Sequence, residues 1–112
     1  MAAVYTSNLV INTGSSFSQT FTLEGNDDSA FNLTDYTVTA QMRKWRGATT
    51  AVDFTTAIPS PATQGKILLS LTATETSTLK PGRHVYDVQI VLGATKELAV
   101  EGSVLVREGV TR

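Results

Sequence analysis

The sequence predicts an all-β protein that folds as an antiparallel β-sandwich of about seven strands. Short segments in which apolar and polar residues alternate recur along the chain, and this two-residue period is typical of strands with one buried face. Clusters of Gly, Pro, Asn and Asp separate the segments, as expected at the turns of a sandwich or a barrel. Threonine and serine are abundant, and threonine suits the pleated surface of a strand.

The first part of the chain predicts two strands, from Asn8 to Asn12 and from Ser16 to Leu23. In the second of these, three large apolar side chains share one face: Phe17, Phe21 and Leu23. Gln19 lies in the same phase, so its polar amide is predicted to face the core and to need a hydrogen-bonding partner there. Residues 24–28 predict an exposed loop, because Gly, Asn and Asp favour turns, and a short extended piece follows over residues 30–32.

The central part predicts a turn over residues 33–35, two further strands and a loop. The first of these strands runs from Tyr36 to Lys44 and has the most regular alternation in the chain. Its inward-facing residues are expected to be Tyr36, Val38, Ala40 and Met42. The second strand is marked by Val52, Phe54 and Ile58. Residues 59–65 predict a loop at the edge of the sandwich, because its prolines cannot donate to a ladder.

The C-terminal half predicts three strands and one short helical turn. The first strand spans Lys66 to Leu71, and the Thr-x-x-Glu spacing of a capping box predicts a helical turn over residues 73–79. Pro81 and Gly82 end this turn and begin a strand with one apolar face, formed by Tyr86, Val88, Ile90 and Leu92. The last strand runs from Lys96 to Arg107, and its inward-facing residues are Leu98, Val100, Val104 and Val106. Gly102 lies in the same phase, which predicts a bulge or the close approach of another backbone.

Length and composition indicate a single domain over residues 1–112. A chain of 112 residues, 41% hydrophobic and 17% charged, can bury one core but not two. The two ends, residues 1–7 and 108–112, are expected to be mobile, because chain termini are poorly ordered unless something holds them. The C-terminal end has no apolar periodicity, so it is either frayed or held by a partner.

The charge and the missing residue types argue against several classes of function. Nine basic and ten acidic residues give a net charge of -1, so no basic field is present to attract nucleic acid or an anionic membrane. The absence of cysteine removes disulfides, thiolate nucleophiles and cysteine-based metal sites. No segment has the pattern of a signal peptide or of a membrane-spanning helix. We therefore expect synthesis in the cytoplasm, with neither nucleic acid nor a membrane as partner.

No constellation of residues indicates catalysis, a cofactor or a small-molecule substrate. His84 is the single histidine, so it lacks a second imidazole for a transition metal and an evident nucleophile to activate. A residue that packs and hydrogen-bonds at a strand end is the favoured interpretation. Asn26, Asp27, Asp28 and Asp35 carry the oxygen atoms that calcium prefers, but a solvated turn explains them better, and a calcium ion near Asp27 and Asp28 is the alternative. We expect a protein that is not an enzyme.

One local cluster combines basic and aromatic residues: Arg43, Lys44, Trp45 and Arg46. Trp45 is the only tryptophan, and Trp and Arg are enriched at the energetic centres of protein interfaces. An exposed Trp45 would therefore be an interface anchor. The alternative is that Trp45 closes the end of the core while the charges solvate the strand terminus. The sequence leaves these two interpretations open.

Four segments in combination resemble a known family: residues 31–43, 65–67, 79–88 and 100–106. They read Phe-Asn-Leu-Thr-Asp-Tyr-Thr-Val-Thr-Ala-Gln-Met-Arg, Gly-Lys-Ile, Leu-Lys-Pro-Gly-Arg-His-Val-Tyr-Asp-Val and Val-Glu-Gly-Ser-Val-Leu-Val. The chain resembles small virion proteins of tailed bacteriophages and is similar to the N-terminal immunoglobulin-like domain of phage baseplate upper proteins. Asp35 stands where Gly is commoner in that family, and His84 where Tyr is commoner. The resemblance extends from about Leu9 to Arg107 and implies an immunoglobulin-like β-sandwich.

The resemblance also implies a role, that of a non-enzymatic structural component of a tailed-phage virion. Its place would be the tail, the baseplate or the fibre-attachment apparatus, with capsid decoration as the alternative. The partners would be other virion proteins and copies of the chain itself in a symmetric assembly, contacted through exposed edges and chain ends. The candidate interface residues are Tyr5, Arg43, Trp45, Arg46 and Arg112. The alternative of another class is a carbohydrate-binding or adhesive module that uses Trp45 with Tyr5 or Tyr36, although 7% aromatic residues are few for a sugar platform.

Overall fold

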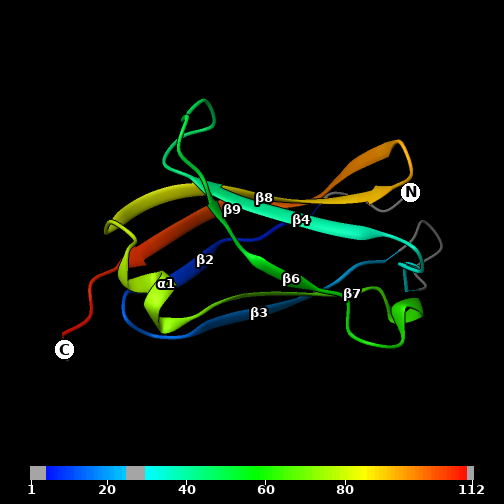
Figure 1. Cartoon of the computed structure of the whole chain (residues 1–112), viewed down its shortest axis with the longest axis horizontal. Helices are drawn as coiled ribbons and strands as arrows, with labels where there is room; N and C mark the ends of the chain where they lie inside the picture. Colours follow the sequence, from blue (N-terminus) through cyan, green and yellow to red (C-terminus); the bar gives the residue numbers. More distant parts are fainter. Residues whose placement is uncertain (1–4, 25–29, 111–112) are drawn as a thin grey trace.

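The protein folds as two β-sheets that pack face to face. The computed structural model describes residues 5–24 and 30–110. In Figure 1 one layer contains β4, β8 and β9, and the other contains β3, β6 and β7. The predicted β-sandwich is thereby confirmed. No helix in the described ranges is long and apolar enough to cross a membrane.

The larger sheet has six strands and the smaller sheet has three. The larger sheet is formed by β1 (Tyr5–Thr6), β2 (Leu9–Asn12), β4 (Thr37–Arg43), β5 (Val52–Asp53), β8 (Gly82–Leu92) and β9 (Thr95–Arg107). Its order is β1-β9-β8-β4-β5, with β2 also paired to β9. The smaller sheet has the order β3-β7-β6 and is formed by β3 (Phe17–Thr22), β6 (Thr55–Ala57) and β7 (Lys66–Leu71). A 3-10 turn, η1 (Ala62–Gln64), precedes β7, and a short helix, α1 (Ala73–Ser77), follows it.

The strand pairs are antiparallel except at the N-terminal edge of the larger sheet. There β1 and β2 both run parallel to β9, with Tyr5 opposite Val100 and Leu9 opposite Val104. The Ser7 amide between them donates to the Glu101 carbonyl at 2.9 Å. Residues 5–7 of the N-terminal segment therefore belong to the sheet and join the start of the chain to its last strand.

The single strand predicted around Phe54 is two short strands in different sheets. β5 pairs with β4, whereas β6 pairs with β7. Between them the Phe54 amide donates to the Ala40 carbonyl at 3.0 Å, and the Phe54 ring is buried. The prediction of one strand is wrong because the chain crosses from one layer to the other at Phe54.

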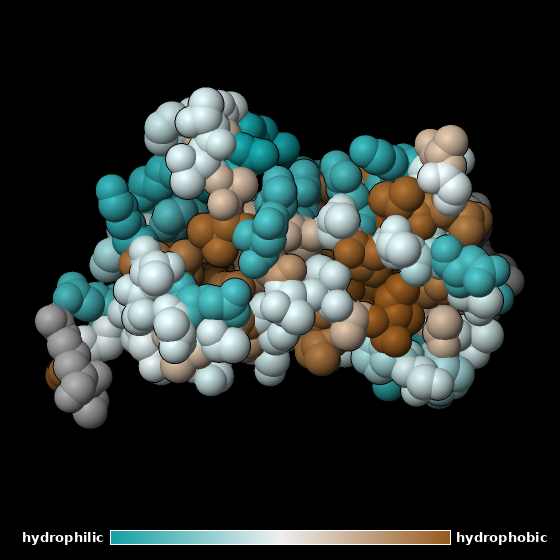
Figure 2. Space-filling model, viewed as in Figure 1, coloured by the Kyte–Doolittle hydropathy of each residue, from teal (hydrophilic) through white to brown (hydrophobic). Residues whose placement is uncertain are grey.

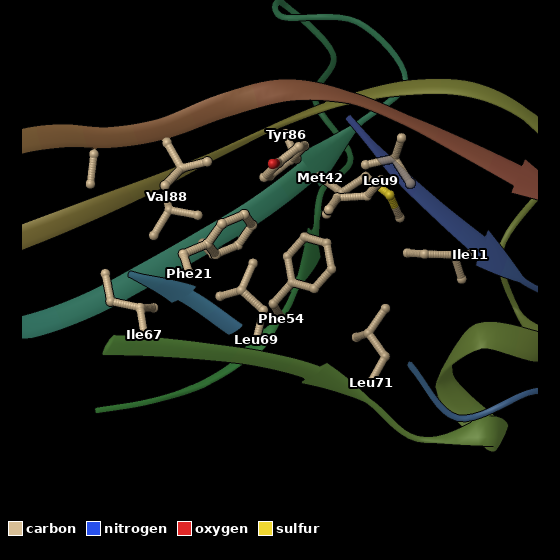
Figure 3. Packing of buried hydrophobic residues seen from close by; sticks show 14 of the residues in the cluster. Leu9, Ile11, Phe21, Met42, Phe54, Ile67, Leu69, Leu71, Tyr86 and Val88 are labelled. Carbon is tan, nitrogen blue, oxygen red and sulfur yellow. The ribbon is translucent and has the colours of Figure 1, made fainter. Parts of the chain in front are cut away.

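The core lies between the inward faces of the two sheets, and Figure 3 shows its centre. The Phe54 ring lies 6.1 Å from Phe17 and 6.2 Å from Tyr86, edge-on to the latter. The predicted inward-facing rows are largely buried, and their buried members include Ala40, Met42, Ile67, Leu69, Leu71, Val88, Ile90, Val100, Val104 and Val106. Leu92, at the end of its row, is exposed.

Gln19 was predicted to face the core, and the structure places it in solvent. Gln19 is exposed, and its side-chain nitrogen donates to the Thr20 carbonyl at 3.3 Å. The expected core amide is therefore a solvent-facing group, because β3 is an edge strand.

The bulge in the hairpin of β8 and β9 lies at Ala99, where the register shifts between Val88 and Gln89. Gly102 instead permits a close approach, since a Cβ there would overlap the Ser7 carbonyl oxygen.

The turn at residues 33–36 gives β4 its starting direction. The Tyr36 amide donates to the Leu33 carbonyl at 3.0 Å, and Asp35 has a positive φ of 67°. A type II turn requires a positive φ at this position, a conformation that Gly adopts most readily and Asp less often. The Asn32 side chain braces the turn by accepting from the Thr34 amide at 3.0 Å.

Candidate functional site

The loop between β4 and β5, residues 44–51, carries the predicted basic and aromatic cluster. It projects from the body of the sandwich (Figure 1). The Ala48 amide donates to the Trp45 carbonyl at 3.0 Å, and the Arg43 guanidinium donates to the Ala48 carbonyl. These two bonds close the loop at its base, and the buried Ala48 side chain holds it to the core.

Trp45 lies near the start of this loop with 63% of its surface exposed. Its ring lies beside Gly47, where an added Cβ would be 3.8 Å from the indole. The interpretation that Trp45 closes the end of the core is therefore wrong. A large indole left in water on a braced loop is the arrangement expected of an interface anchor.

A groove of about 440 Å³ lies at the base of the loop. Its apolar lining comes from Met42, Ala48, Val52 and Leu79. Figure 2 shows hydrophobic residues below the projecting loop. Trp45 also lines the groove, and the polar lining residues are the cationic Arg43, Lys44 and Lys80 together with His84, Thr49, Thr50 and Thr78.

His84 has a structural contact at this groove. Its Nε2 atom lies 2.9 Å from the Lys80 carbonyl oxygen, across the connection between α1 and β8. The favoured interpretation, a histidine that packs and hydrogen-bonds at a strand end, agrees with this contact. The described part of the chain contains no group of three or more His, Asp or Glu side chains placed to hold a metal ion.

A second, smaller hollow of about 240 Å³ lies on the outer face of the larger sheet. Its polar lining residues are Gln41, Arg43, Arg46, Asp87 and Gln89. Arg46 reaches from the loop to β9 and forms an ion pair with Glu101 at 3.0 Å. The loop is thus tied to the sheet at its far side, although an exposed ion pair of this kind adds little stability.

A row of polar side chains crosses this outer face from strand to strand. Asp53 lies opposite Gln41, Gln41 opposite Asp87, and Asp87 opposite Glu101. The Gln41 side chain donates to Asp53 at 2.7 Å. Asp87 and Glu101 are like charges placed directly opposite each other, an arrangement that disfavours the pair, and the Arg46 guanidinium that pairs with Glu101 offsets part of this repulsion.

The structure brings together three of the five predicted interface residues. Arg43, Trp45 and Arg46 belong to one loop and its base. Tyr5 belongs to β1, at the opposite edge of the same sheet. Arg112 and the possible calcium ligands Asp27 and Asp28 lie outside the described residues. Leu79 and Lys80 were missed, because they reach the groove from a separate part of the chain.

Comparison with known proteins supports the fold and gives no family. No known protein family and no curated protein matches the sequence. A crystal structure of Listeria monocytogenes InlP matches 90% of this chain with a TM-score of 0.50 and 17% identity. A marsupial T cell receptor structure matches 94% of it with a TM-score of 0.53 and 13% identity. The fold is an immunoglobulin-like β-sandwich. The chain spans 26% of the InlP chain and 51% of the receptor chain.

The immunoglobulin-like sandwich places its apolar groove and its polar hollow on either side of one loop. Arg43 lines both of them. Among the described residues that line them, neither contains a nucleophile oriented by a base, or a pair of carboxyl groups facing each other across a cleft. The arrangement suits binding, with one apolar anchor and cationic residues that line the groove.

Proposed function

We propose that this chain is a non-enzymatic assembly domain that binds another protein through the loop at residues 44–51. The observation that carries the proposal is the exposed indole of Trp45, held on a braced loop above an apolar groove. Solvent contact with such a ring is unfavourable, and burial of a tryptophan in a partner's pocket supplies a large share of the energy at many interfaces. The ring and the groove together form a site that a partner segment can cover.

The charge around the groove favours an acidic partner segment. Lys44, Lys80 and Arg43 line the groove, and no carboxylate does. A segment with one apolar side chain for the groove and nearby carboxylates would therefore be complementary to this lining.

The assembly that we propose is the virion of a tailed bacteriophage. Support for this step comes from the four sequence segments that resemble phage virion proteins, in particular the baseplate upper proteins. The tail, baseplate or fibre-attachment apparatus is the proposed place, and capsid decoration is the alternative. The partners are other virion proteins and further copies of the chain, in numbers set by the symmetry of the particle.

The experiment is quantitative mass spectrometry of purified particles from the phage that encodes the chain, produced with wild type, Trp45→Ala or Val10→Ala. Val10 is a matched control, because it is also an exposed apolar residue and lies on β2. We expect the wild-type chain at a small multiple of three or six copies per particle, and Trp45→Ala reduced at least about tenfold. Val10→Ala should be incorporated normally.

Two results would overturn parts of this proposal. If the chain is absent from purified particles, the virion role fails. If Trp45→Ala is folded and is incorporated as well as Val10→Ala, the loop is not the binding site. A copy number close to that of the major capsid protein would instead favour decoration. Trp45 is the only tryptophan, so its fluorescence reports on the site in the purified wild type and in Val10→Ala.

A carbohydrate-binding role has less support in the geometry. Tyr36, one of the rings expected to help Trp45 hold a sugar, is half-buried and packs edge-on against Phe31 at 5.6 Å. Tyr5, the other ring, belongs to β1 at the opposite edge of the sheet. A glycan screen on wild type and Trp45→Ala tests the alternative, and binding that disappears in the variant would favour it over protein binding.

A further inference from the structure

One edge of the smaller sheet, formed by β3, presents main-chain groups that no strand in the described part of the chain pairs, and the Thr20 carbonyl among them accepts from the Gln19 side chain at 3.3 Å. β3 pairs with β7 on one side, and no strand in the described part of the chain pairs its other side. The Leu23 amide, just after β3, donates toward β7, to the Gly65 carbonyl at 2.8 Å. Because bonding direction alternates along a strand, the main-chain groups of Ser18, Thr20 and Thr22 face away from β7. These are the groups that a further strand would use.

β3 is longer than the other edge strands, β1, β2, β5 and β6. Residues 15–22 carry no charge, no proline and no glycine. Natural proteins usually protect such an edge with charge, proline or shortness, because it otherwise pairs with another chain. β5 is protected in this way, since it has two residues and one of them is Asp53. β3 is six residues long and has no such protection.

We propose that β3 is an interface at which two copies of this chain pair edge to edge, antiparallel, about a two-fold axis at Gln19. The strand is self-complementary in that register. Phe17 lies opposite Phe21 of the second copy, Ser18 opposite Thr20, and Gln19 opposite Gln19, so each pair joins like chemistry on the same face. The smaller sheets of the two copies become one continuous sheet across the axis.

Charge supports a second copy as the occupant. On the outward-facing positions of β3, β6 and β7, Lys66 is the one charged residue. It lies opposite Thr22, at one end of β3. The two-fold axis therefore places the two Lys66 side chains at opposite ends of the interface. No charge is buried, and none meets a like charge.

This inference deepens the assembly proposal and can be tested separately from it. β3 follows β2 and lies on the side of the sandwich away from β6 and the loop of Trp45. Trp45→Ala should therefore leave the self-association unchanged. If the virion role fails while the dimer forms, only the proposed function is lost. If the dimer fails while Trp45→Ala prevents incorporation, only the β3 proposal is lost.

The first test is sedimentation equilibrium of the purified chain and of Gln19→Lys, with Thr55→Lys as the matched control. Thr55 is also exposed and lies on β6, in the same sheet but away from the proposed axis. We expect a concentration-dependent dimer for wild type and Thr55→Lys, weakened about fivefold or more in Gln19→Lys, because like charges then lie opposite each other. An equimolar mixture of Gln19→Lys and Gln19→Glu should associate more tightly than either variant alone.

The second test uses the absence of cysteine from the natural chain. The Gln19 residues of the two copies would form a non-hydrogen-bonded pair across the axis, with their Cα atoms about 4.5 Å apart. This distance is within the range that a disulfide can bridge. Gln19→Cys should therefore oxidise to a covalent dimer, and Thr55→Cys should not. The proposal is overturned if the wild type is a monomer at every concentration, or if the two cysteine variants cross-link equally.

Discussion

At the scale of single residues, Tyr86 is the most informative contact in the core. Its ring is buried beside Phe54, and its hydroxyl donates to the Ser7 carbonyl at 2.6 Å. Burial disfavours the tyrosinate and raises the pKa of Tyr86 to about 12. One hydroxyl therefore links the middle of β8 to the N-terminal edge of the sheet.

This pKa predicts a loss of stability at alkaline pH. The unfolded chain releases the Tyr86 proton near its ordinary pKa of about 10, whereas the folded chain retains it to about 12. Between these values the unfolded state binds fewer protons, so the free energy of unfolding falls as pH rises. The loss should reach about 2 kcal/mol by pH 12. Urea titrations from pH 8 to 12 measure it.

Tyr86→Phe is the control for this prediction. The free energy of unfolding of the variant should be about 1 kcal/mol lower at neutral pH, because the Ser7 carbonyl loses its donor. The variant should also lack the fall in stability at alkaline pH that Tyr86 ionisation causes. Parallel pH profiles for wild type and Tyr86→Phe would contradict the assignment. The sequence placed Tyr86 in the buried phase, but it gave no sign of its acceptor, which lies 79 residues away.

Trp45 and Gln19 show the limit of sequence reasoning at this scale. Alternation gives the phase of a side chain within its strand, and it does not say whether the neighbouring layer covers that position. Gln19 has the core phase but lies in an edge strand, so water reaches it. Trp45 follows a strand, and its exposure depends on a loop closed by Arg43 and Ala48. Both outcomes depend on tertiary packing.

At the scale of elements, α1 is the part that local sequence specifies most completely. The predicted capping box is present: the Thr72 hydroxyl accepts from the Glu75 amide at 3.1 Å, and the Glu75 carboxylate accepts from the Thr72 amide at 2.9 Å. The buried Thr76 hydroxyl donates to the Ser15 carbonyl at 2.8 Å and fixes the helix to the turn before β3. The capping box can be predicted from the sequence because its hydrogen-bonding partners lie within one helical turn of each other.

Thr72→Ala should destabilise the protein by about 1 kcal/mol, since the Glu75 amide loses its side-chain acceptor. Thermal or urea unfolding measures this change. Thr74→Ala is the control, because Thr74 is an exposed residue of the same helix outside the capping box. Its effect should be smaller than that of Thr72→Ala. Equal effects of the two substitutions would show that the capping box adds nothing to stability.

Strand existence was predicted better than strand pairing. β7 and β8 agree closely with the alternation, because each period-two segment is bounded by turn residues. The crossing at Phe54 and the parallel pairing of β2 with β9 were not predicted. Pairing partners lie far apart in sequence, and alternation carries no information about which edge a strand joins.

At the scale of the whole molecule, the sandwich is closed by its own N-terminal segment. β1 and β2 cover the edge of β9, and the Ser7 carbonyl enters the space above Gly102 that a Cβ would fill. The start and the end of the chain thus stabilise each other.

Deletion of residues 1–7 should therefore destabilise the domain itself, by about 3 kcal/mol, as well as remove any contact with neighbours. The deletion removes β1, the bond from Ser7 to Glu101, and the acceptor of the buried Tyr86 hydroxyl. Deletion of residues 1–4 keeps these groups and is the comparison that isolates the contribution of residues 5–7. Gly102→Ala tests the same closure without shortening the chain, because its methyl group would displace the Ser7 carbonyl. In urea unfolding, the free energy of unfolding of Gly102→Ala should be close to that of the deletion of residues 1–7. It should be well below that of Gly47→Ala, because a Cβ at Gly47 contacts only the Trp45 ring. If Gly102→Ala and Gly47→Ala are equally stable, the N-terminal strand does not hold the sandwich closed.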